Sequence, residues 1–275
     1  MDTQLIAWNG VRFSAPADWR PGKIGHRFLG FADNRGPAMD LRWKAVGSGF
    51  SPESWVKKAR GVTPAPLAPE WQRALPGLAL AGLASRGPAR ARGLAAFCPE
   101  CGTATVFLFY GEKPRAGIPR VLASFSDHPE ADDVPWSLFD IRARVPRDLA
   151  LKTWSFLPGR FELSFAGHGT ALALARFAPA NALLSGHTLS AWVRERLPTA
   201  SGAETGDETR VQREEPPSPS PWKRLARRLS GRPVHTLCRA WVVGEKNRIL
   251  TAAASSARPM DTARMLNIFD AFEAI

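Results

Sequence analysis

The sequence predicts an α+β fold made of two pseudo-symmetric copies of an antiparallel-sheet domain with flanking helices. Two observations lead to this prediction. Short segments in which apolar and polar residues alternate, as in half-buried strands, open both halves of the chain. In addition, five segments of the first half recur in the same order in the second half, roughly 130 residues later.

The repeated segments place the first copy at 1–133 and the second copy at 134–275, with a boundary near Asp133 to Leu138. The matched pairs are VRFSAPAD (11–18) with IRARVPRD (141–148), RFLGF (27–31) with RFELSF (160–165), MDLRW (39–43) with LALARF (172–177), SPESWVKKA (51–59) with TLSAWVRERL (188–197), and GEKPRAGIPRVLASFS (111–126) with GEKNRILTAAASS (244–256).

Each copy is expected to begin with three alternating strands and to continue with a helix. In the first copy, Ser51 can cap the start of this helix, Pro52 suits its first position, and Glu53 favours the positive end of the helix dipole. A hairpin turn is expected at each Gly-Glu-Lys, and a final helix at Asp261–Ala274 closes the second copy. Antiparallel strands with helices at the ends of each copy indicate α+β layers.

The second copy contains an insertion at 198–220 that is polar, rich in proline and almost free of apolar residues. Because such a segment buries too little surface to offset its ordering entropy, we expect a flexible loop. A surface helix is expected after it. Its basic residues form either a solvated face or a contact with an anion or a partner, and they are Lys223, Arg224, Arg227 and Arg228.

The opening of each copy resembles a known family. A strand that ends in a "VP.D" or "AP.DW" step, followed by "RF.L.F", a third strand and a helix, is similar to the opening of PsbP-like domains. The resemblance implies an α/β/α sandwich around an antiparallel sheet. It also implies a binding or assembly role more often than an enzymatic one, and it assigns no functional residue to this sequence.

Charge and composition limit the classes of partner and location. The formal net charge is +12, and most of the basic residues are arginine, which fits either a nucleic-acid or other polyanion surface or the codon bias of a GC-rich genome. No apolar run is long enough for a membrane span, and no leader segment is recognisable. Together with three cysteines, too few for a disulfide framework, this favours a cytoplasmic protein.

The segment Cys98-Pro99-Glu100-Cys101-Gly102 is typical of a zinc knuckle, in which two thiolates at positions i and i+3 point the same way. A structural zinc site needs four ligands. His235 and Cys238 have the same spacing, so Cys98, Cys101, His235 and Cys238 together would form a zinc site. An alignment of the two copies on their Gly-Glu-Lys segments argues against symmetric ligand pairs, because Cys238 then aligns with Thr105 and not with Cys101. Free thiols, a decayed knuckle or a redox-active dithiol remain alternatives.

Other signs of chemistry are few. His128 follows Asp127 in a polar segment that we interpret as a linker between the copies, with an acidic metal-binding loop as the alternative. No phosphate-binding loop, nucleophile elbow or paired-carboxylate signature is present, which disfavours an enzyme. The sequence therefore favours a non-catalytic binding or assembly protein within a larger complex. A thiol redox or metal-handling protein and a polyanion binder are the alternatives.

Overall fold

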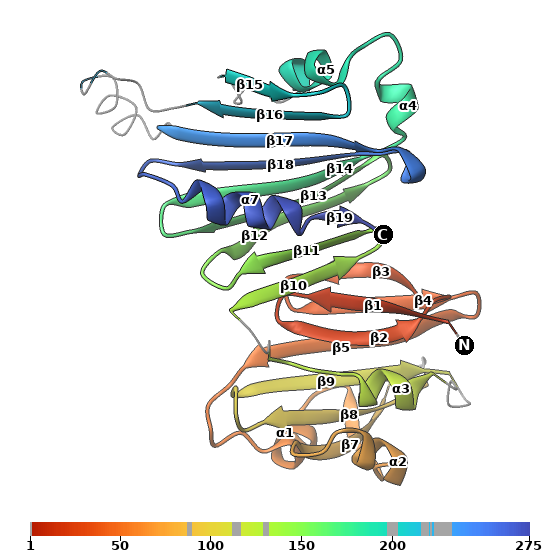
Figure 1. Ribbon diagram of the computed structural model, residues 1–275. Coiled ribbons are helices and arrows are strands. Elements are labelled where there is room, and N and C mark those ends of the chain that lie inside the picture. Colours follow the sequence, from red (N-terminus) through yellow and green to blue (C-terminus); the bar gives the residue numbers. More distant parts are fainter. Residues whose placement is uncertain are drawn as a thin grey trace. The chain divides into compact units, whose positions relative to one another are not determined.

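The computed structural model describes residues 2–86, 90–111, 117–128, 132–196, 203–215, 220, 222 and 233–275. The chain divides into two compact units. The first comprises Met1–Ala131 and Pro135–Phe139, and the second comprises Asp132–Val134 and Asp140–Ile275. Both units are built mainly from antiparallel strands (Figure 1). No helix in the described part of the chain has the length and apolarity needed to span a membrane.

The predicted α+β class is wrong, because the fold is all-β. Strands account for 52% of the described residues and helices for 18%, and these strands form three antiparallel sheets. The expected flanking helices are short, and none of the described α-helices exceeds nine residues. Alanine-rich segments such as Ala79–Ser85 and Arg248–Ser256 form strands despite the helix propensity of alanine. Ladder pairing on both sides overrides that propensity.

The first unit is organised around a seven-stranded sheet with the strand order β3-β4-β5-β9-β8-β7-β6. Its strands are β3 (Arg20–Gly25), β4 (Phe28–Asp33), β5 (Gly36–Ala45), β6 (Val62–Pro64), β7 (Ala79–Ser85), β8 (Ala91–Cys98) and β9 (Thr103–Tyr110). The same unit contains the hairpin of β1 (Thr3–Trp8) and β2 (Val11–Pro16), and β1 also pairs with β10 (Asp133–Leu138).

Short helices cover both faces of the first sheet (Figure 1). Helix α1 (Pro52–Lys58) packs Val56 against one face, and α2 (Pro69–Ala74) packs Trp71 on Phe109 at the other. Helix α3 (Ile118–Ala123) contacts β2 and α2. The Ser51 cap is confirmed, since its side chain accepts a hydrogen bond from the Ser54 N–H at 3.2 Å.

The second unit contains a seven-stranded sheet with the order β12-β13-β14-β18-β17-β16-β15. Its strands are β12 (Ala150–Leu157), β13 (Arg160–Gly167), β14 (Thr170–Phe177), β15 (Ala203–Gly206), β16 (Arg210–Glu215), β17 (His235–Val243) and β18 (Arg248–Ser256). The 3₁₀ turn η1 (Gly244–Lys246) joins β17 to β18, and β11 (Ile141–Pro146) pairs with β19 (Glu273–Ala274).

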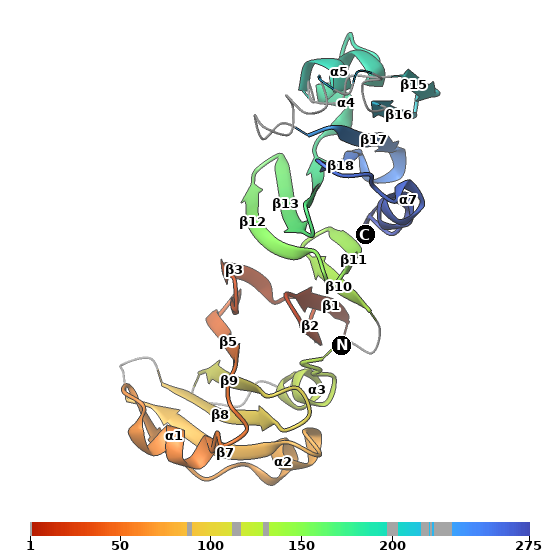
Figure 2. The same cartoon turned by 90° about the vertical axis from the view of Figure 1, so that its left-hand side faces the viewer.

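Helices also cover both faces of the second sheet (Figure 2). Ala240 of β17 packs with α5 (Leu189–Arg196), close to α4 (Ala180–Leu183). Its neighbour Arg239 points to the opposite face, where its guanidinium bonds Asp270 of α7 (Thr262–Asp270) at 2.5 Å. The Asp261 cap of α7 is present, but the helix ends before the predicted Ala274, because the last residues pair with β11 instead.

The two seven-stranded sheets have the same strand order. If the seven strands of each sheet are numbered along the chain, both sheets have the order 1-2-3-7-6-5-4. This order is the one that two copies of a single domain would show. The fifth sequence match is nevertheless out of register. Gly244–Lys246 connects β17 to β18, whereas Gly111 follows β9, and residues 112–116 lie outside the described residues. In the first unit, the equivalent connection, from β8 to β9, is Pro99–Gly102.

The predicted flexible insertion at 198–220 is wrong in part, since β15 and β16 lie within it and pair with each other. Val211 is buried against α5, and the buried Arg213 guanidinium bonds Glu204 at 2.5 Å, so the segment does gain contacts that offset its ordering. The residues Lys223, Arg224, Arg227 and Arg228 lie outside the described residues. Their neighbour Trp222 is exposed.

Gly93 offers a test of the first sheet. In Gly93→Ala the new Cβ would overlap the carbonyl oxygen of Phe107 on β9, so we expect a loss of about 2 to 3 kcal/mol in the unfolding free energy. The measurement is urea unfolding. Gly47→Ala is the matched control, because no atom lies within 4 Å of the added Cβ there. Equal stabilities of the two variants would contradict this packing.

Candidate metal centre

The CPECG segment forms the turn of a hairpin. Strand β8 ends at Cys98, which pairs with Thr103 at the start of β9. The Gly102 N–H donates to the Cys98 carbonyl at 3.0 Å and closes the turn. Gly102 has a φ of +66°, a left-handed conformation that glycine adopts without strain. The turn therefore holds Cys98 and Cys101 on one short loop.

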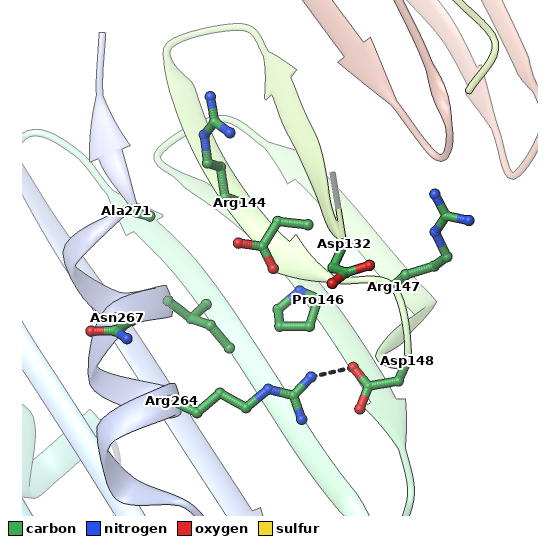
Figure 3. A pocket seen from close by; sticks show the side chains of 10 residues that line it. Asp132, Arg144, Pro146, Arg147, Asp148, Arg264, Asn267 and Ala271 are labelled. Atoms are coloured by element: carbon green, nitrogen blue, oxygen red, sulfur yellow. Dashed lines mark hydrogen bonds and ion pairs between the residues drawn. The ribbon is translucent and has the colours of Figure 1, made fainter. Parts of the chain in front are cut away.

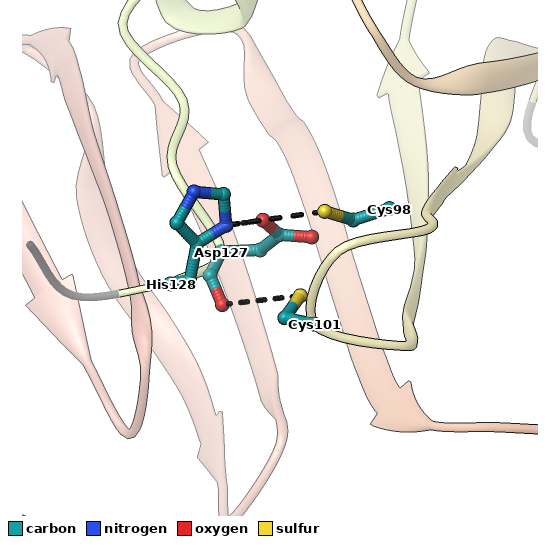
Figure 4. Close-up of side chains that lie close together, drawn as sticks. All are labelled: Cys98, Cys101, Asp127 and His128. Carbon is teal, nitrogen blue, oxygen red and sulfur yellow. Dashed lines mark hydrogen bonds and ion pairs between the residues drawn. The ribbon is translucent and has the colours of Figure 1, made fainter.

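A second segment brings Asp127 and His128 to this turn. Ser126 forms an isolated bridge with Arg12 of β2, in which each backbone N–H donates to the other carbonyl at 2.9 Å. The Ser126 hydroxyl also donates to the His128 carbonyl at 2.9 Å. These hydrogen bonds fix the chain just after α3, and Figure 4 shows the side chains of Asp127 and His128 beside the two cysteines.

The four side chains form a compact cluster. One ligand atom from each of Cys98, Cys101, Asp127 and His128 lies within 4.8 Å of all the others. The Cys98 sulfur lies 3.9 Å from His128 Nδ1, and Asp127 Oδ1 lies 2.9 Å from the same nitrogen. Zinc bonds of about 2.0 to 2.3 Å imply ligand separations of about 3.3 to 3.8 Å. The cluster can therefore hold a metal ion after small side-chain movements.

Burial differs among the four groups. Cys98 is buried and the Asp127 side chain is only 4% exposed, whereas Cys101 is exposed and the His128 side chain is 45% exposed. Glu100, in the turn itself, places Oε2 at 3.7 Å from His128 Nε2. If Nδ1 binds the metal, Glu100 can accept a hydrogen bond from Nε2–H and orient the ring, as outer carboxylates do in many zinc sites.

The electrostatics of the cluster favour ligation over thiol chemistry. Desolvation of its sulfur raises the pKa of Cys101, although the residue as a whole is exposed. The hydrogen bond to Cys98 and the charge of Asp127 raise this pKa further, against hydrogen bonds from Thr103 that lower it. Reactive redox cysteines have lowered pKa values. A Cys–His–Asp relay also does not fit, because Cys98 and Asp127 both approach Nδ1 of His128, whereas a relay uses the two ring nitrogens separately.

The structure divides the predicted ligand set between its two units. Cys98 and Cys101 belong to the cluster in the first unit, whereas His235 and Cys238 lie on β17 of the second. His235 and Cys238 do not form a second knuckle, since the side chains of residues three apart on a strand point to opposite faces of the sheet. Cys238 is buried between Arg213 and Ala253, and burial raises its pKa to about 11. A site formed by all four predicted residues stays a prediction.

Strand register removes the symmetry argument for that predicted set. Cys98 ends β8, but His235 begins the equivalent strand β17. The positions equivalent to Cys98 and Cys101 are Val243 and Lys246, because each hairpin has four connecting residues between its last pairs. Asn247, with a φ of +54°, takes the place of Gly102. The second unit therefore has no cysteine at either position.

Asp127 and His128 were interpreted as part of a linker, with an acidic metal-binding loop as the alternative, and they were not connected with the cysteines of the turn. Cys101 and Asp127 are 26 residues apart, and only the bridge at Ser126 brings them together. The available signal was local: His128 lies directly beside a carboxylate, a pair of residue types that suits metal binding.

A cavity of about 520 Å³ lies in the second unit (Figure 3). Its charges balance, since three carboxylates and three guanidinium groups line it. Arg264 donates to Asp148, and this hydrogen bond lowers the pKa of Asp148. The side chains of Arg144 and Arg147 point away from that pair. Arg264 and Asp148 are thus already paired with each other, and the cysteine cluster is the stronger candidate site.

Single substitutions distinguish the two ligand sets. We expect His128→Ala to abolish stoichiometric zinc binding and His235→Ala to leave it unchanged, because His128 forms a compact cluster with both cysteines of the turn within the first unit. The measurement is metal content after dialysis against a weak chelator. The reverse pattern would show that His235 and Cys238 complete the site.

Comparisons with known proteins give no relationship: no protein-family model matches the chain, and no curated protein resembles it significantly in sequence.

Proposed function

We propose that the chain is a non-catalytic binding or assembly protein, a subunit or accessory factor of a larger complex, whose first unit is stabilised by structural zinc. The cluster of Cys98, Cys101, Asp127 and His128 is the observation that carries this proposal. Two thiolates, an imidazole and a carboxylate suit zinc, because calcium and magnesium prefer oxygen ligands and copper(I) prefers softer sets.

The number of ligands supports a structural role. Four protein ligands complete a tetrahedral zinc shell, whereas catalytic zinc keeps one position for water or substrate. The ligands also come from two segments that are 30 residues apart at Cys98 and His128. A metal ion at this place would tie the β8–β9 hairpin to the chain after α3, and its binding free energy would add to the stability of the folded state.

Other features support a binding role. The matching strand orders support two copies of one domain. The opening of each copy resembles that of PsbP-like domains, a family that includes many binding and assembly proteins. All three cysteines are free thiols, which suits a reducing compartment such as the cytoplasm.

The polyanion alternative gains less support from the described residues. The buried Arg176, Arg213 and Arg239 are each paired with a carboxylate, so part of the basic excess serves the structure of the second unit. Redox chemistry at the CPEC turn is opposed by the raised pKa of Cys101.

Metal analysis and thiol titration test the proposal. We expect about one zinc per chain, and chelation should lower the thermal midpoint by about 5 °C or more, because zinc stabilises the folded state alone. In the zinc-bound protein, Cys98 and Cys101 should resist a thiol reagent and should react after chelation. The Cys101→Ser variant is the control, since its midpoint should not respond to the chelator.

A metal-free protein whose two thiols react freely and close reversibly to a disulfide would contradict the zinc role and favour the redox alternative.

A further inference from the structure

A cavity of about 310 Å³ in the first unit lies beneath α2, apart from the cysteine cluster. It is bounded by the loop before α2, by α2 itself, by the ends of β7, β8 and β9, and by the start of α3. None of its lining residues belongs to the metal centre. Ligand pockets of about 300 to 1,000 Å³ are usual, so this volume suits a small molecule.

The apolar part of the cavity is preformed. Trp71 of α2 packs edge-on against Phe109 of β9, with ring centroids 5.3 Å apart, and Ile118 of α3 lies beside them. All three side chains are buried by other parts of the unit, so their positions do not depend on a ligand. Aromatic rings favour edge-to-face contact with a further ring.

Two exposed charged side chains of opposite sign line the same cavity. Glu70 comes from α2 and Arg92 from β8. Among the residues that the structure describes, neither side chain forms a hydrogen bond or an ion pair, and the two do not pair with each other. A ligand with one charge would pair with only one of them. A zwitterion could pair with both at once.

We propose that this cavity binds a free aromatic α-amino acid. Arg92 would bind the carboxylate, Glu70 would bind the ammonium group, and the ring would lie against Trp71 and Phe109. This goes beyond the proposed zinc-stabilised assembly role and does not depend on it, since a protein without zinc would retain the same cavity residues.

Three matched probes test each part of the proposal by calorimetry: L-phenylalanine, phenylacetate without the amine, and phenethylamine without the carboxylate. We expect L-phenylalanine to bind about tenfold more tightly than either of the others, the loss expected for one charge-assisted hydrogen bond. Arg92→Gln should weaken L-phenylalanine and phenylacetate about tenfold and leave phenethylamine unchanged. Glu70→Gln should show the reverse selectivity.

Glu70 and Arg92 are exposed, so both variants should fold, and their zinc content should equal that of the parent protein. Arg86→Gln is the matched control, because this exposed arginine follows β7 and does not line the cavity. The proposal is overturned if L-phenylalanine shows no saturable binding at millimolar concentration, or if Arg92→Gln and Arg86→Gln bind all three probes equally.

Discussion

The backbone bridge between Arg12 and Ser126 is the constraint on which the metal centre depends. Two hydrogen bonds of 2.9 Å fix the chain after α3 against β2, and the next two residues are Asp127 and His128. The β8–β9 turn, which begins after Cys98, places its two cysteines next to Asp127 and His128. Backbone pairing therefore sets the positions of the ligands before any metal binds.

This arrangement explains why the thiols and the metal belong together. The Cys101 thiol is a poor nucleophile in the free protein, because desolvation, with a smaller contribution from the Asp127 charge, raises its pKa. A zinc ion reverses this, since its charge stabilises both thiolates and the carboxylate. Glu100 would then orient His128 from the solvent side. The same residues that hinder redox chemistry in the free protein would favour a closed zinc shell.

Sequence patterns predicted features that depend on neighbouring residues. The Ser51 cap is confirmed, because a capping side chain reaches only a few residues along its own helix. Longer-range features were predicted less well. The α+β class was wrong, because ladders such as those between Ala79–Ser85 and Ala91–Cys98 join residues that local patterns do not connect. The polar composition of the insertion did not indicate β16. This strand is stabilised by the packing of Val211 against α5 and by the ion pair between Arg213 and Glu204.

The candidate site shows the same division between local and distant information. The spacing of Cys98 and Cys101 indicates a knuckle from five consecutive residues. Asp127 and His128 depend on a strand bridge that no local pattern encodes, so a search by spacing led to His235 and Cys238 instead. Strand register, which only the structure provides, places Val243 rather than a ligand at the position equivalent to Cys98.

X-ray absorption at the zinc edge of the purified full chain tests the central claim most directly. The account predicts two sulfur ligands at about 2.3 Å and two nitrogen or oxygen ligands at about 2.0 Å, from Cys98, Cys101, Asp127 and His128. A shell of three sulfurs and one nitrogen would contradict it, because this shell requires Cys238 in addition to the two cysteines of the turn.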